Sequence, residues 1–356
     1  MKAEKLKEIF KRFDHSSEFK SYTQLASGHI NDTYLIECSA KPNYVLQRIN
    51  HGVFKDVPGL ISNKIGVSKH ISKQLTEFSE EQRRKHVLSF FQTKEKENYY
   101  IDAEGNFWNL MLFIENSVTH EIVEDKEIAY EGGKLFGAFL NLTKDYDAST
   151  LCEVIPKFHD MSFRYAQFEE SLKSVYIDRI EEAAAYIKLV NELKEEMHIL
   201  QKLKESGAIK LRVTHNDTKI SNALFDKHKK GMCVIDTDTV MPGIIHYDFG
   251  DAIRTICNSA AEDEKNLDLV IFNVDYYKAY KKGFLEEIGD SITDLERSYL
   301  VLGAKSMIFI MAIRFLTDFL NGDIYYKTKY REHNLDRAKN QFKLLDSLND
   351  QIKEIA

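Results

Sequence analysis

Four polar residues near the middle of the chain have types and spacing suited to chemistry on a hydroxyl group. His215, Asp217 and Asn222 lie in the segment His-Asn-Asp-Thr-Lys-Ile-Ser-Asn, and Asp236 ends the next apolar run. The spacing H-x-D-x-x-x-x-N is that of a phosphoryl-transfer loop, where the Asp accepts a hydroxyl proton and the Asn and a later Asp hold Mg²⁺. The pattern predicts Asp217 as a catalytic base and His215 as a residue that braces the loop through hydrogen bonds.

The residues after this loop predict how the metal ligands meet. Two short apolar segments, 222–226 and 232–236, flank a polar turn centred on residue 229. Antiparallel pairing about that centre places Asn222 directly opposite Asp236, and such pairs have Cβ atoms roughly 4.5–5.5 Å apart. Because Mg²⁺ needs only one or two protein carboxylates besides phosphates and water, we expect Asn222 and Asp236 to hold it.

The tripeptide Asp248-Phe249-Gly250 is spelled like the magnesium-binding segment of protein kinases. It lies 31 residues after Asp217 (248 − 217 = 31), too far along the chain to pair with Asn222 in a hairpin. We expect Asp248 to begin a helix instead, on which Asp251 and Arg254 pair three residues apart.

Composition limits the class of protein. The 356 residues are 43% hydrophobic, enough for a sizeable core and about two domains. The net charge of −7 argues against a nucleic-acid partner or an anionic membrane surface. The four scattered cysteines favour reduced thiols, and the charged N-terminus lacks a signal-peptide apolar region. The longest apolar run, 307–313, is too short to span a bilayer. A cytoplasmic protein is therefore expected.

The hydrophobic period changes along the chain, from strand-like to helical. Strands are predicted at 22–26, 33–37, 44–49, 87–92, 99–101 and 107–114, with one helix at 57–75. Helices are predicted at 129–142, 163–175, 180–206, 262–288 and 294–320, with short strands at 213, 223–226 and 232–236. The expected fold is α+β and bilobal, with an antiparallel-sheet N-lobe (1–116) that covers the nucleotide and a larger helical C-lobe (117–356) with the catalytic loop.

The catalytic segment and Ile235-Asp236-Thr237-Asp238 resemble the aminoglycoside phosphotransferase/choline kinase superfamily. Further segments, 27–34, 239–243, 247–251 and 314–320, are similar to N-acetylhexosamine 1-kinases. The resemblance covers most of the chain. It implies a protein-kinase-like fold that uses ATP and Mg²⁺ to phosphorylate the anomeric hydroxyl of GlcNAc or GalNAc, giving the sugar 1-phosphate.

The resemblance also implies nucleotide contacts. The polar turn at Gly28 would bring backbone N–H groups to the phosphates. The strand 44–49 has no Lys, and the resembling choline kinases use Arg in this strand, so we assign Arg48 to the α/β-phosphates. A hinge at 113–117, including Glu115 and Ser117, would bind adenine. The helix at 57–75 has no acid between Pro58 and Gln74, and Asn63 is the expected substitute.

Four residues are expected to contact the sugar: His29, Asn31, Arg314 and Tyr325. Buried partners for sugar hydroxyls discriminate strongly between acceptors. The segment 158–160 is expected only to pack and to cap a helix.

Alternative acceptors are choline, an aminoglycoside or another sugar, and another class is a non-catalytic kinase-like binding module. A choline site would favour an aromatic cage, and the single Trp lies in the N-lobe. We expect a monomer or a weak homodimer.

Overall fold

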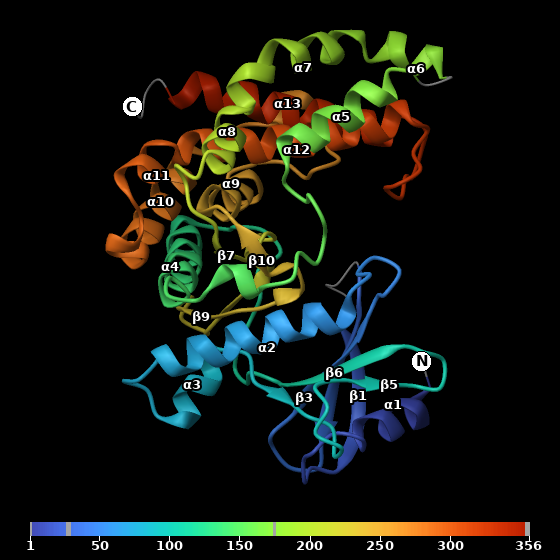
Figure 1. The fold of residues 1–356 in the computed structure, drawn as a ribbon, viewed down its shortest axis with the longest axis vertical. Coiled ribbons are helices and arrows are strands. Elements are labelled where there is room, and N and C mark those ends of the chain that lie inside the picture. The colour runs from blue at the N-terminus through green and yellow to red at the C-terminus, as the bar shows by residue number, and fades with distance from the viewer. Residues whose placement is uncertain (1, 26–29, 174–175, 353–356) are drawn as a thin grey trace.

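The computed structural model describes residues 2–25, 30–173 and 176–352. Two of the predicted site residues, Gly28 and His29, lie outside these ranges. A small sheet-containing lobe is followed by a larger helical lobe, drawn in green to red in Figure 1. The predicted α+β bilobal fold is confirmed.

The N-lobe is built on an antiparallel six-stranded sheet. Its strands are β1 (Phe19–Leu25), β2 (Asp32–Cys38), β3 (Tyr44–Ile49), β4 (Phe90–Phe91), β5 (Tyr100–Ile101) and β6 (Phe107–Leu112). The order is β1-β2-β3-β6-β4, with β5 also on β6. The helix α1 (Ala3–Phe10) buries Leu6 and Phe10 against the sheet residues Tyr34, Leu46 and Trp108.

Two helices connect β3 to β4. The first, α2 (Val57–Gln74), begins where the Asp56 carboxylate accepts a hydrogen bond from the Gly59 N–H, with Pro58 in its first turn. It lies between the sheet and the helical lobe (Figure 1). The second, α3 (Glu80–His86), was not predicted because its charged sequence has no apolar period. It is stabilised by a capping box between Ser79 and Gln82.

Most of the C-lobe is helical. Its helices are α4 (Lys126–Leu142), α5 (Met161–Ser171), α6 (Ile177–Glu182), α7 (Ala184–Met197), α8 (Ile199–Glu205), α9 (Ile245–Ile256), α10 (Val274–Ile288), α11 (Asp294–Ser298), α12 (Leu300–Leu320) and α13 (His333–Ile352). The predicted helix at 180–206 is divided among three helices. The one predicted at 262–288 begins only at Val274, where the Asn273 side chain caps it.

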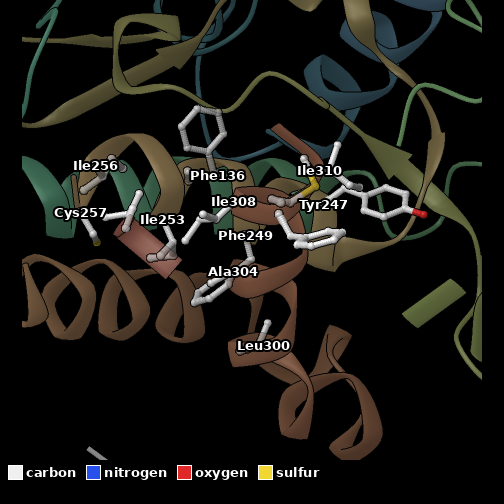
Figure 2. Close-up of a cluster of buried hydrophobic side chains, with 14 of the residues drawn as sticks. Phe136, Tyr247, Phe249, Ile253, Ile256, Cys257, Leu300, Ala304, Ile308 and Ile310 are labelled. Carbon is white, nitrogen blue, oxygen red and sulfur yellow. The ribbon is translucent and has the colours of Figure 1, made fainter. Parts of the chain in front are cut away.

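The helix α12 forms the centre of the C-lobe. By length and composition it is the one helix in the described ranges that could cross a membrane, yet most of its apolar window is buried inside the protein. Figure 2 shows Ala304 and Ile308 of α12 beside Phe249 and Ile253 of α9. The apolar residues of α12 therefore form part of the C-lobe core, and they pack against α9.

Four short strands bring the predicted catalytic segments together. The strand β7 (Arg212–Thr214) pairs with β10 (Met241–Gly243), and β8 (Ala223–Phe225) pairs with β9 (Gly231–Val234). The predicted catalytic loop joins β7 to β8, and the short helix η3 (Thr237–Thr239) joins β9 to β10. Two strand pairs thus place the loop and residues 236–239 next to each other.

Candidate active site

A cavity of about 350 Å³ lies between the two lobes, and the predicted base and metal ligands line it. Its lining includes Asp217, Asn222 and Asp236 from the C-lobe, and Asn31 from the N-lobe. Apolar side chains of both lobes, among them Val45 and Leu224, form other parts of the wall. An apolar cleft with a few convergent polar groups is the usual form of a nucleotide or small-molecule site. We refer to it below as the cleft.

Asp217 is held at the wall of this cleft by its own loop. Asn216 has a left-handed backbone (φ 64°), which turns the chain sharply before Asp217. The Asn222 amide donates to the Asp217 carbonyl at 2.8 Å and to its carboxylate at 3.0 Å. The Lys219 ammonium lies 3.2 Å from the same carboxylate oxygen. The carboxylate is half-buried and oriented, as a base that meets a hydroxyl must be.

His215 braces the loop, through bonds that also define its tautomer. Its ring is buried, and Nε2 lies 2.8 Å from the Ile235 carbonyl, so Nε2 carries the proton. The Asp217 N–H donates to Nδ1 at 3.3 Å. Both ring nitrogens are therefore occupied by backbone groups, and His215 has no free nitrogen with which to transfer a proton.

The predicted hairpin register is wrong by one residue. Ala223 pairs with Val234 and Leu224 with Cys233, and the Ile235 N–H donates to the Asn222 carbonyl at 2.9 Å. A bulge between Leu224 and Phe225 shifts the pairing, so Asn222 is opposite residue 235. Asp236 still lines the cleft because its backbone turns into the left-handed region (φ 58°) directly after the strand.

Three carboxylates, those of Asp217, Asp236 and Asp238, line the same part of the cleft. Burial raises the pKa of Asp236 to about 7, and the charges of Asp238 and Asp217 act in the same direction. In the described ranges no three His, Cys, Asp or Glu side chains form a metal cluster. Asn222 and Asp236 fit Mg²⁺ as hard oxygen donors completed by phosphates and water. When bound there, Mg²⁺ would offset the negative charge of the phosphates.

Asp248 holds the backbone of the catalytic loop by hydrogen bonds, and it does not line the cleft. Its carboxylate accepts the N–H groups of His215 at 2.8 Å and Asn216 at 2.7 Å. One turn later, the Asp251 carboxylate accepts the Thr218 N–H at 3.0 Å. The predicted pair of Asp251 with Arg254 is present at 3.0 Å. The helix α9 begins at Ile245, so Asp248 lies inside its first turn and does not cap it as predicted.

Arg48 lies on the other face of its strand, which contradicts the predicted phosphate contact. Side chains alternate along β3, and Val45 and Gln47 are the ones that line the cleft. The Arg48 guanidinium instead forms an ion pair with Asp32 and donates to Asn106 at 3.2 Å. The prediction chose the charged side chain of the strand, but the alternation turns it away.

The buried cation of the cleft is Lys64, which sequence reasoning missed. It comes from α2, and its ammonium forms an ion pair with Asp238 and donates to the Gln47 side chain at 3.0 Å. Asn31 donates to the same Asp238. A signal was present, since Lys64 falls at helical spacing with the apolar residues that α2 buries.

Asn63, the predicted substitute for an acid on this helix, has a structural role. Its side chain bridges the Cys152 and Val240 backbones, with both donor distances at 2.8 Å. It therefore fastens α2 to the C-lobe. Lys219 is the other cation of the cleft that was not predicted, although it is only two residues from Asp217.

Some side chains of the predicted hinge, 113–117, line the cleft and others do not. Phe113, Ile114 and Ser117 line the cleft, and the Ser117 hydroxyl donates to the Ile114 carbonyl at 2.7 Å. Glu115 points elsewhere, to an ion pair with Lys41, and is not part of the cleft wall. The hinge can therefore offer a nucleotide base its backbone and Ser117, whereas the Glu115 side chain contributes nothing to the cleft wall.

Arg314 and Tyr325 lie together in a cluster of aromatic rings. The Arg314 guanidinium lies 5.3 Å from the centre of the Phe158 ring and 5.9 Å from that of Tyr325. Asp318 accepts the Tyr325 backbone N–H at 2.8 Å and so fixes the segment after α12. Tyr325 itself is 69% exposed.

This cluster, defined by Phe158, Arg314 and Tyr325, adjoins the catalytic loop. The buried ring of His159, which follows Phe158, has Nε2 at 3.3 Å from the Asn216 carbonyl. Asn216 is the neighbour of Asp217. The segment 158–160 was expected only to pack and to cap a helix; Asp160 does cap α5, where it accepts the Phe163 N–H at 2.8 Å, and the segment also links the cluster to the loop. Asn31 is on the N-lobe side of the cleft and not in this cluster.

A known protein family matches more than half of the chain. The model of the phosphotransferase enzyme family (APH) matches residues 21–269. The chain belongs to the phosphotransferase enzyme family. This match includes the catalytic loop, η3 and all the residues that line the cleft, and it ends before Arg314 and Tyr325.

Solved structures show the same fold at low identity. An amicoumacin kinase in complex with AMP-PNP, Ca²⁺ and Ami is 11% identical, with a TM-score of 0.63 over 97% of this chain and 94% of that one. A spectinomycin phosphotransferase in complex with ADP and spectinomycin is 13% identical, with a TM-score of 0.59 and 99% of both chains covered. A microcompartment-associated aminopropanol kinase is 14% identical, with a TM-score of 0.59 over 99% of this chain and 98% of that one.

Proposed function

We propose that this phosphotransferase is an ATP-dependent small-molecule kinase whose acceptor is an N-acetylhexosamine, phosphorylated on its anomeric hydroxyl. The observation that supports a kinase reaction is the position of Asp217 at the wall of the cleft. Lys219 and Asn222 bond to it there, and Asp236 lines the same cleft. Similar solved structures carry AMP-PNP or ADP, which agrees with a nucleotide in this cleft.

The chain's own residues have defined tasks in this reaction. Asp217 orients the acceptor hydroxyl and takes its proton as the oxygen bonds to the γ-phosphorus. The bond between that phosphorus and the β,γ-bridging oxygen breaks, and ADP leaves. The Lys219 ammonium lies 3.2 Å from the Asp217 carboxylate and is placed to stabilise the charge of the transferred phosphoryl group. Lys64, next to Gln47 and Asp238, is placed for the remaining phosphates.

The sugar acceptor is supported by the segments that resemble N-acetylhexosamine 1-kinases and by the cluster of Phe158, Arg314 and Tyr325. A guanidinium held over aromatic rings offers donors for hydroxyl or acetamide oxygens and flat apolar faces for a sugar ring. The cluster is linked through His159 to Asn216, the residue before the proposed base. An acceptor bound there would be close to Asp217.

The acceptor is tested by an ADP-release assay with Mg²⁺ over GlcNAc, GalNAc, glucose, galactose, choline and kanamycin. Phosphorus NMR of the product identifies the phosphorylated oxygen. We expect the highest kcat/KM for an N-acetyl sugar and an anomeric phosphate signal. If phosphocholine or a phosphorylated aminoglycoside were the main product, the proposal of an N-acetylhexosamine acceptor would be wrong. ATP binding without turnover of any acceptor would favour a binding module.

A further inference from the structure

A second cavity, of about 380 Å³, lies between α2, α4 and β9. Val67 and Ile71 of α2 line one side, Leu135 and Phe139 of α4 another, and Val234 of β9 a third. Its volume falls in the range of small-molecule sites. We call it the rear cavity. Both lobes contribute to its wall, as they do to the cleft.

The carboxylates and the ammonium that line the rear cavity are paired with protein groups, and the His86 ring has Nδ1 at 2.9 Å from the Met232 carbonyl. Glu131 accepts the Lys230 ammonium at 3.0 Å and the Gly231 N–H at 3.2 Å. Lys134 pairs with Glu287 at 3.1 Å. With each of these charges occupied, an ion entering the cavity would lose its hydration without gaining a partner. The lining favours an uncharged ligand.

Thr237, which lines both the rear cavity and the cleft, has a side-chain hydroxyl without a hydrogen-bond partner in the described part of the chain. The Thr237 side chain is 5% exposed, and its hydroxyl has no hydrogen-bond partner among the described residues. Buried hydroxyls are normally hydrogen-bonded, so this one marks a place where a ligand can donate or accept. Partly buried apolar side chains, such as Leu75 and Phe78, lie along the rest of the wall. The combination suits an apolar body that carries one hydroxyl or carbonyl group.

Two elements connect the rear cavity to the cleft. Thr237 lines both cavities and lies between Asp236 and Asp238 in the chain. The helix α2 presents Lys64 to the cleft and, one turn later, Val67 and Ser68 to the rear cavity. A molecule that packs against Thr237 and α2 therefore contacts both elements of the ion pair, α2 with Lys64 and η3 with Asp238.

We propose that the rear cavity binds an uncharged, largely apolar small molecule with one hydroxyl or carbonyl group. Its occupancy holds α2 and η3 in the observed arrangement, and it thereby tightens nucleotide binding in the cleft. The binding itself is independent of the proposed function, whereas its effect on nucleotide affinity rests on the cleft's being the nucleotide site. By linkage, the nucleotide must tighten the small molecule by the same factor.

The probe for this site is 3-phenylpropan-1-ol, and the readouts are ligand-observed NMR and calorimetric titration of the full chain. We expect saturable binding that persists at saturating ADP, and an ADP affinity that rises at least threefold in the presence of the probe. The charged analogue 3-phenylpropylammonium should bind at least tenfold more weakly. Displacement of the alcohol by ADP would place it in the cleft and overturn the proposal.

Variants locate the probe. Ala138→Phe, on α4, fills the rear cavity and should abolish probe binding while leaving the melting temperature and ADP affinity near wild type. Ala185→Phe, on the exposed face of α7, is the matched control and should bind normally. Thr237→Val keeps the side-chain shape without the hydroxyl and should weaken the alcohol about tenfold. Unchanged probe binding in Ala138→Phe would overturn the site. Intact probe binding with no change in ADP affinity would overturn only the coupling.

Discussion

Lys64 and Asp238 form an ion pair inside the cleft, although 174 residues separate them in the chain. Their side chains are only 2% and 3% exposed. Lys64 belongs to α2 of the N-lobe and Asp238 to η3 of the C-lobe, so the pair connects the two lobes inside the cleft. Where kinases of known type place a Lys on the third strand and an acid on the helix, this chain has Gln47 on the strand and the Lys on the helix.

Moving the cation between these positions tests whether its charge or its helix matters. Lys64→Met leaves the buried Asp238 carboxylate without its cation and with only the Asn31 and Gln47 amides as donors, so we expect the free energy of unfolding to fall by about 3 kcal/mol. It should also raise the KM for ATP at least tenfold. The double variant Gln47→Lys/Lys64→Gln returns a cation to the same carboxylate, because the Gln47 amide already lies 3.3 Å from Asp238. It should recover most of both losses in urea unfolding and steady-state kinetics.

Lys73→Met is the control for this pair, since Lys73 is exposed on the same helix. It should leave both measurements within error of wild type. A double variant with stability restored and KM still high would mean that Lys64 must approach the phosphates from α2 itself.

Asp217→Asn removes the proposed base and retains the shape of the side chain. Its amide oxygen can still accept from the Asn222 side chain, so the melting temperature should change little. We expect kcat to fall roughly 10²- to 10⁴-fold, the usual contribution of a positioned base, and the KM for ATP to stay within about threefold. Asp145→Asn, at an exposed carboxylate, is the matched control. Turnover close to wild type in Asp217→Asn would remove this residue from the mechanism.

The strands and their faces were predictable from the sequence, including the face of its strand on which Arg48 lies. Strand 44–49 is observed with the predicted bounds, and its period-two alternation was already enough to separate residue 47 from residue 48. The charged residue was preferred because kinases need a cation there. The sequence of α2 held the better candidate, since Lys64 interrupts an otherwise apolar face.

Other features depended on tertiary contacts that spacing does not encode. The bulge that shifts Asn222 against residue 235 comes from one extra residue in β9, and the left-handed backbone at Asp236 restores the convergence. The bulge has no clear sequence signal, and although Asp adopts a left-handed backbone more readily than most residues, its presence alone does not predict one. The helix α13 did have a signal, with Leu335, Ala338 and Phe342 at helical spacing, and it was overlooked.

The two candidate metal carboxylates, Asp236 and Asp248, are separated by a magnesium titration. Asp248 bonds to the loop backbone, so Asp248→Asn should lower kcat about tenfold because one backbone N–H loses its acceptor. The Mg²⁺ concentration for half-maximal activity should not change. In Asp236→Asn that concentration should rise at least tenfold, since a cleft carboxylate is lost. The reverse pattern would make Asp248 the metal ligand.

Asp102 makes the stability of the N-lobe depend on pH. Burial alone would raise the pKa of Asp102, but hydrogen bonds from Asn106, Trp108 and Lys5 outweigh it and hold the pKa well below the ordinary 3.8. The folded chain therefore keeps this carboxylate ionised at pH values where the unfolded chain has already bound a proton. The stabilisation is complete above about pH 4 and is lost as pH falls below it.

The expected slope is up to about 1.4 kcal/mol of unfolding free energy per pH unit below pH 4 from this group. Urea unfolding followed by the fluorescence of Trp108, the single tryptophan, reports directly on its surroundings, because its indole N–H donates to Asp102 at 3.0 Å. Asp102→Asn should lose about 2 kcal/mol at pH 7 and flatten the slope, whereas Asp145→Asn should keep the wild-type slope. An equal slope in wild type and Asp102→Asn would show that other carboxylates control the acid transition.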